Sequence, residues 1–91
     1  MMIRKHIIIS GLVQGICFRM HTQRQADSLG VKGWVKNLPN GKVEAVFEGY
    51  ESDVDKLIIW CNQGPPYAEV DNIEIYKEEY TGEFDNFSIT Y

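Results

Sequence analysis

The sequence predicts an α+β fold in which two helices cover one face of a mostly antiparallel sheet. Stretches of alternating apolar and polar residues predict strands, and two stretches with helical spacing predict helices. Their order is β-α-β-β-α-β, followed by a short C-terminal strand or a hairpin. This order is typical of the split βαβ arrangement, a ferredoxin-like two-layer α/β sandwich. A chain of 91 residues is long enough for one core, so we assign residues 1–91 to a single domain.

The first predicted strand is Ile3–Ser10, and isoleucines on both of its faces favour a central position in the sheet. Residues Leu12–Cys17 are expected to form a loop. From Phe18 the apolar spacing changes to that of one helix face, and Gly30 is the expected C-cap of this helix. The apolar stripe consists of Phe18, Thr22, Ala26 and Leu29.

A second strand is expected at Val31–Leu38 and a turn at Pro39–Gly41. The Asn40-Gly41 pair is typical of a tight hairpin in which both residues adopt positive φ angles. The third strand should therefore fold straight back, with one face toward the core, and end at Gly49. Its inward residues are Val43, Ala45 and Phe47.

The second helix is predicted to begin after an N-cap at Ser52, with Asp55 at the capping-box position, and to end at Gly64-Pro65-Pro66. Its inward stripe consists of Val54, Leu57, Ile58 and Cys61. Alternation then predicts strands at residues 72–76 and 86–91, separated by a turn at Thr81-Gly82.

Charge is unevenly distributed along the chain, whose formal net charge is −4. Residues 1–43 contain seven Lys and Arg against one Asp, whereas residues 44–91 contain two Lys against twelve acidic residues. The first half attracts small anions and the second repels an extended polyanion, so we expect no nucleic-acid partner. No apolar run approaches the ~20 residues of a membrane span, and the N-terminus reads as a strand, so we expect a cytoplasmic protein with no membrane partner.

The two cysteines, Cys17 and Cys61, are far apart in sequence and have no metal-ligand spacing. In a cytosolic chain both are expected to be free thiols, with Cys61 in the core and Cys17 in a loop. The alternatives are a redox-sensitive bridge between them and a nucleophilic Cys17. A nucleophile needs a neighbouring base, which the sequence does not indicate.

The stretch Ile9–Arg19 has the features of an anion-binding loop. Gly11 and Gly15 allow the backbone to turn so that successive N–H groups converge, and the start of a helix adds unpaired donors. Arg19 would supply a charged fork that matches two phosphate oxygens. Many strand-to-helix turns share this pattern, so an ordinary salt bridge of Arg19 is the alternative at this point.

A second motif runs from Gly33 to Val43. Together the two motifs resemble the two signatures of the acylphosphatases. The first signature, Gly-x-Val-Gln-Gly-Val-x-Phe-Arg, is matched from Gly11 to Arg19. The second, Gly-aromatic-Val-x-Asn-x-x-x-Gly-x-Val, is matched from Gly33 to Val43 and includes Asn37. Because the spacing of the motifs, the chain length and the Gly-Pro-Pro loop also agree, the resemblance covers essentially the whole chain.

Two residues depart from the family pattern. Ile16 stands where the family usually has valine, and overpacking in the phosphate loop could shift its N–H groups. Asn40 stands where Asp is common, and both residue types suit a turn. Neither departure removes a functional group.

The resemblance implies hydrolysis of acyl phosphates to a carboxylate and inorganic phosphate. It implies that Arg19 binds the phosphoryl group, that Asn37 orients the attacking water, and that Gly15 shapes the loop. Inorganic phosphate is expected as product and inhibitor. No cofactor and no metal are implied, and we expect a monomer. The phosphate-binding loop implied by the resemblance comprises Gln14, Gly15, Ile16, Cys17, Phe18 and Arg19.

Two other functions are compatible with parts of the pattern. An RNA-binding module shares the βαββαβ layout, but the aromatic residues that should follow Lys32-Gly33-Trp34 are missing. A phosphate-binding module without turnover would keep the same scaffold. We expect packing roles for Trp34 and Trp60, and structural or solvated positions for the two histidines.

Overall fold

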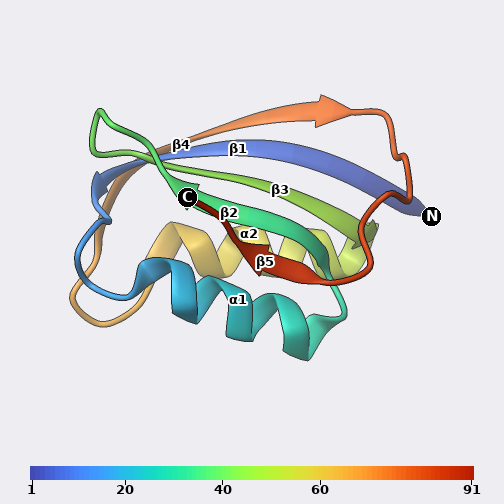
Figure 1. The fold of residues 1–91 in the computed structure, drawn as a ribbon, viewed down its shortest axis with the longest axis horizontal. Coiled ribbons are helices and arrows are strands. Elements are labelled where there is room, and N and C mark those ends of the chain that lie inside the picture. Colours follow the sequence, from blue (N-terminus) through green and yellow to red (C-terminus); the bar gives the residue numbers. More distant parts are fainter.

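The computed structural model describes residues 1–91 as two helices packed on one face of a five-stranded sheet (Figure 1). The strand order in the sheet is β4-β1-β3-β2-β5, and all neighbours are antiparallel except β2 and β5. The predicted α+β sandwich is therefore confirmed. In chain order the elements are β1 (Met2–Leu12), α1 (Phe18–Leu29), β2 (Lys32–Asn37), β3 (Val43–Tyr50), α2 (Glu51–Gln63), β4 (Glu69–Glu78) and β5 (Phe87–Ile89).

β1 lies inside the sheet between β3 and β4, which confirms its predicted central position. Ile7 and Ile9 on this strand are fully buried beneath the helices. The pairing of β1 with β4 shifts register between Ser10 and Gly11. Gly11 has a φ of 129°, and a Cβ there would collide with the carbonyl oxygen of Glu69. Glycine at this bulge thus lets the end of β1 leave the sheet and enter the following loop.

The helices divide the sheet between them: α1 packs on β2 and β5, and α2 packs on β1, β3 and β4. Phe18, Thr22 and Ala26 of α1 are buried as predicted, whereas Leu29 of the predicted stripe is half-buried. Gly30 ends the helix in a left-handed conformation. The predicted stripe of α2 is also buried. A core of 15 buried residues fills the space between the two layers. Neither helix has the length and apolar character needed to cross a membrane.

The predicted N-cap of α2 at Ser52 is wrong. The helix begins at Glu51 directly after β3, its N-cap is Tyr50, and no side chain caps it. The N–H of Glu51 instead donates to the carbonyl oxygen of Met1, at 3.0 Å. The carbonyl of Met1 thus accepts a hydrogen bond from the start of the helix, where a Ser hydroxyl was expected to be the acceptor. The capping box with Asp55 does not form.

The predicted hairpin between β2 and β3 is present, but its turn differs from the predicted one. Gly41 has a positive φ of 90°, whereas Asn40 does not have a positive φ. The chain closes through a longer loop in which the N–H of Leu38 donates to the carbonyl of Lys42, at 2.8 Å. The side-chain oxygen of Asn40 accepts from the N–H of Lys42, at 3.0 Å, and supports this wider loop.

The C-terminal segment does not form a hairpin with β4. β5 lies at the opposite edge of the sheet and pairs with β2 in parallel (Figure 1). The connection is held partway by the buried carboxylate of Glu48, which accepts from the N–H of Thr81 at 2.9 Å and of Gly82 at 3.2 Å. Only Phe87–Ile89 of the predicted strand 86–91 is assigned as strand.

Candidate active site

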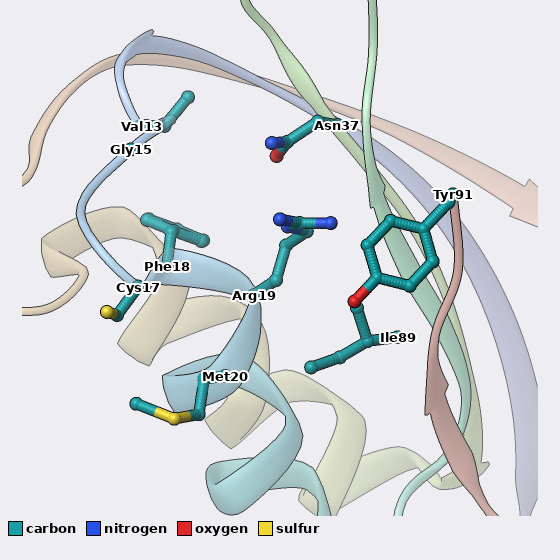
Figure 2. A pocket seen from close by; sticks show the side chains of 9 residues that line it. All are labelled: Val13, Gly15, Cys17, Phe18, Arg19, Met20, Asn37, Ile89 and Tyr91. Carbon is teal, nitrogen blue, oxygen red and sulfur yellow. The ribbon is translucent and has the colours of Figure 1, made fainter.

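A cavity of about 340 Å³ lies where the β1–α1 loop, the end of β2 and the C-terminal segment meet (Figure 2). Among the predicted site residues, it brings together Gly15, Cys17, Phe18, Arg19 and Asn37. Residues 18 positions apart in sequence, Arg19 and Asn37, thus share one small space. Its lining residues are Val13, Gly15, Cys17, Phe18, Arg19, Met20, Asn37, Ile89 and Tyr91.

The β1–α1 loop turns through two residues in the left-handed region. Gly15 has a φ of 77° and Cys17, the N-cap of α1, has a φ of 65°. A positive φ is unusual for cysteine and strains the backbone. The N–H groups of Gly15, Ile16 and Cys17 donate to no backbone carbonyl. Together with the unpaired N–H groups of the first turn of α1, these free donors are of the kind that can bind an anion.

Arg19 is half-buried in the first turn of α1 and forms no ion pair. Its guanidinium carbon lies 5.1 Å from the centre of the Tyr91 ring. The alternative prediction, a salt bridge of Arg19 at the start of the helix, is therefore wrong. A half-buried guanidinium without a carboxylate partner is available for an anionic ligand.

Asn37 is the last residue of β2, where it pairs with Val43 across the hairpin. Its side chain and that of Arg19 point toward one another (Figure 2). The Oδ1 atom of Asn37 is buried and has no hydrogen-bond partner. It is the one buried side-chain polar atom of the chain in this condition. A buried acceptor without a donor costs free energy, so such an atom is a marker of function.

Gln14 and Ile16, both predicted as part of the phosphate-binding loop, do not line the cavity. The Gln14 side chain turns to the β2–β3 hairpin and donates to the carbonyls of Leu38, at 2.7 Å, and Lys42, at 2.8 Å. Ile16 is half-buried and packs against the hydrophobic core.

Four lining residues were missed by the sequence reasoning: Val13, Met20, Ile89 and Tyr91. Val13 lies within the loop motif and Met20 directly follows it, but as apolar residues both indicated only packing. Tyr91 reaches the site because β5 pairs with β2, with Ile89 opposite Val35. Asn37 and Tyr91 each lie two residues beyond that pair, and no local pattern indicates this neighbourhood.

Of the cysteines and histidines, only Cys17 lines the cavity. Cys17 and Cys61 are free thiols, exposed and buried respectively, as predicted. Burial raises the pKa of the Cys61 thiol well above its ordinary value. His6 contacts Glu44, at 2.8 Å, and neither histidine lines the cavity. No group of three or more His, Cys, Asp or Glu residues is placed to hold a metal ion.

Comparison with known proteins identifies relatives along the whole chain. The family model described as acylphosphatase matches residues 5–89. A protein of Syntrophus aciditrophicus named acylphosphatase is 54% identical over 91 residues, which covers 100% of this chain and 95% of that protein. A protein of Geobacter sulfurreducens, also named acylphosphatase, is 53% identical over 91 residues, which covers 100% of this chain and 100% of that protein. The crystal structure of acylphosphatase from Bacillus subtilis superposes with a TM-score of 0.94 at 34% identity and covers 100% of both chains.

Proposed function

The chain belongs to the acylphosphatase family and is a hydrolase that acts on acyl phosphates, and we propose that Arg19, the loop amides and Asn37 carry this reaction. In this proposal the N–H groups around Gly15–Arg19 and the Arg19 guanidinium bind the phosphoryl group. Asn37 orients the attacking water. The products are a carboxylate and inorganic phosphate, which competes for the same site as an inhibitor.

The observation that carries the proposal is the unpaired Oδ1 of Asn37 in the same cavity as Arg19. A buried amide oxygen lacking a donor typically costs about 1–3 kcal/mol, which a water O–H would recover. Since an amide is neutral, it holds a water beside an anionic phosphoryl group without repelling that group. Asn37 is therefore suited to aim the lone pair of the water at phosphorus.

Phosphoryl binding is supported by the absence of carboxylates around Arg19. None of the lining residues is Asp, Glu or His, so nothing in the wall repels the substrate. Arg19 presents a planar fork that bonds two phosphoryl oxygens, and the loop N–H groups meet the remaining charge. Charge spreads over these oxygens in the transition state, so preorganised donors are the main source of catalysis.

The reaction requires little acid–base chemistry from the protein. The oxygen of water forms a bond to phosphorus while the bond from phosphorus to the acyl oxygen breaks, and its electron pair leaves with the carboxylate. A carboxylic acid has a pKa of about 4, so the carboxylate departs at neutral pH without a general acid. Because the wall contains no Asp, Glu or His to act as a base, the proton of the water passes to a phosphoryl oxygen. No cofactor takes part.

Hydrolysis of benzoyl phosphate by the purified protein in the presence of EDTA tests this function. We expect turnover that Arg19→Ala and Asn37→Ala each reduce by at least about 10²-fold, the typical effect of removing one oxyanion-binding donor. Arg19→Ala should also lose inorganic phosphate binding in calorimetry, whereas Asn37→Ala should retain it. Arg24→Ala is the matched control, because Arg24 is exposed on the same helix and forms no ion pair.

Two outcomes would contradict the assigned roles. Wild-type protein that binds inorganic phosphate but hydrolyses nothing would be a phosphate-binding module. Full activity of either variant would exclude that residue from the reaction.

We also propose that the protein acts in the cytoplasm as a monomer. The free thiols of Cys17 and Cys61 are typical of a reducing compartment. Sedimentation equilibrium should give the 10.5 kDa mass of one chain, and a dimer mass would contradict the monomer.

A further inference from the structure

We infer that Gln14 is a positioning residue that holds the hairpin bearing Asn37 at a set distance from the phosphate-binding loop. The inference rests on the proposed function, in which the loop binds the phosphoryl group and Asn37 orients the water. It assigns to Gln14 a role through Asn37, without contact to the substrate.

The geometry of the Gln14 amide is specific for this role. Its Nε2 atom donates to the carbonyl of Leu38 at 2.7 Å and to that of Lys42 at 2.8 Å. A side-chain amide nitrogen carries two N–H donors, so both are used. The two acceptors lie on opposite arms of the β2–β3 hairpin, and Leu38 directly follows Asn37. One side chain thus holds both arms of the hairpin at the level of Asn37.

The backbone hydrogen bonds of the hairpin do not reach the phosphate-binding loop. The ladder between β2 and β3 ends at the pair Asn37–Val43, and the turn beyond it closes on itself. No other hydrogen bond joins residues 13–17 to residues 37–43. The neighbours of Gln14 in sequence, Val13 and Gly15, both line the cavity. The two bonds of Gln14 therefore connect the phosphoryl-binding half of the site to the water-orienting half.

This connection predicts a separation of kinetic parameters. Without the two bonds the loop keeps its own donors and Arg19, so inorganic phosphate still binds. Asn37 is then no longer held at a fixed distance from the bound phosphoryl group. A misplacement of about 1 Å is enough to cost about 10²-fold in rate. The turnover number should fall while the affinity for phosphate changes little.

Four variants test the inference. Gln14→Met keeps the length of the side chain without a donor, and Gln14→Asn keeps the amide but shortens its reach. Gln14→Glu places an acceptor against two carbonyls until it is protonated, when it regains one O–H donor. Gln23→Met is the matched control, because Gln23 also donates its Nε2 to a backbone carbonyl, that of Phe87, at 3.1 Å.

The measurements are kcat for benzoyl phosphate, calorimetric binding of inorganic phosphate, and the NMR signals of the Asn37 side-chain amide. We expect the Gln14→Met and Gln14→Asn variants to lose about tenfold to 10²-fold in kcat. Their phosphate affinity should stay within about twofold of wild type, because Arg19 and the loop amides remain. The kcat of Gln14→Glu relative to wild type should rise from neutral to mildly acidic solution, and that of Gln14→Met should not. The Asn37 amide signals should shift in the Gln14 variants but not in Gln23→Met.

The inference is overturned if Gln14→Met keeps the wild-type kcat, or if kcat and phosphate affinity fall together as expected from damage to the loop. Unchanged Asn37 amide signals would overturn it as well. If the wild-type protein shows no turnover, the proposed function fails, and the NMR comparison still decides whether Gln14 positions Asn37. Should Gln14→Met fail to fold, Gln14→Glu in acidic and neutral solution provides the same test.

Discussion

The guanidinium carbon of Arg19 lies 5.1 Å from the centre of the Tyr91 ring, so residues near opposite ends of the chain form one wall of the cavity. The ring stands beside the group that we propose binds the phosphoryl oxygens (Figure 2). A cation–π contact of this kind orients a guanidinium without neutralising its charge. This arrangement explains how a residue outside both signature motifs contributes to the site.

Replacing Tyr91 by Ala should weaken substrate binding modestly. The side chain is 95% exposed, and an exposed cation–π contact is worth about 0.5–1 kcal/mol, so KM should rise about two- to fivefold. Tyr91→Phe keeps the ring and should behave as wild type. Steady-state kinetics with benzoyl phosphate provides the measurement. Equal losses in both variants would assign the effect to the hydroxyl instead of the ring.

Asn37→Ala should not destabilise the fold, although it removes a half-buried amide. Its Oδ1 has no partner to lose, so the free energy of unfolding should stay within about 0.5 kcal/mol of wild type or rise. Gln14→Ala, by comparison, leaves two carbonyls without their donor and should cost about 1–3 kcal/mol. Urea unfolding of both variants compares them directly. A large loss in Asn37→Ala would indicate a structural role.

Glu48→Gln should destabilise the protein strongly. The carboxylate is 3% exposed and accepts from Thr81, Gly82 and the guanidinium of Arg4, the last at 3.3 Å. A glutamine keeps one acceptor oxygen, but it places an amide NH₂ against the donors on the other side and removes the buried negative charge beside Arg4, for a cost of about 1–3 kcal/mol. Glu79→Gln, at an exposed position of the same connection, should change nothing. Thermal and urea unfolding measure both, and equal stability of the two variants would contradict the anchor role of Glu48.

Acid should weaken the contact between Arg4 and Glu83. The hydrogen bond from Arg4, at 2.6 Å, and then that from Thr81 hold the pKa of Glu83 below its ordinary value. Since the pKa is lower in the folded than in the unfolded protein, this contribution to stability is complete above the ordinary pKa of Glu. It is lost as the pH falls through the folded value. An NMR titration should show the pKa of Glu83 rising toward its ordinary value in Arg4→Met, with the contribution of Thr81 remaining. An unchanged titration would exclude Arg4 as its cause.

The two thiols should differ greatly in reactivity. Cys17 is exposed at the cavity, whereas burial raises the pKa of Cys61 and keeps it from solvent. Iodoacetamide should therefore label Cys17 in the native protein and Cys61 only after unfolding. Peptide mass spectrometry before and after addition of urea distinguishes them. Native labelling of Cys61 would indicate that the core opens readily.

Local patterns in the sequence determined the elements and the two motifs. Isoleucine alternation identified β1, and helical spacing identified the apolar stripes of α1 and α2. These features depend on neighbours within about four residues, because the periods of helices and strands are short. They are therefore readable without knowledge of the rest of the chain. The shared site of Arg19 and Asn37 was predicted from the resemblance of the two motifs to the acylphosphatase signatures.

Only the tertiary structure decided how distant segments meet. Met1 satisfies the helix start that Ser52 was expected to cap, and Glu48 holds the connection that takes β5 to the edge of β2. Pairing of β5 with β2 then brings Tyr91 to Arg19, and Gln14 reaches across 24 residues to the hairpin. A backbone N–H or C=O group forms a hydrogen bond with any suitable partner, whatever the position of that partner in the sequence. Which partner it meets follows from the packing of the whole chain, and so it is absent from any local pattern.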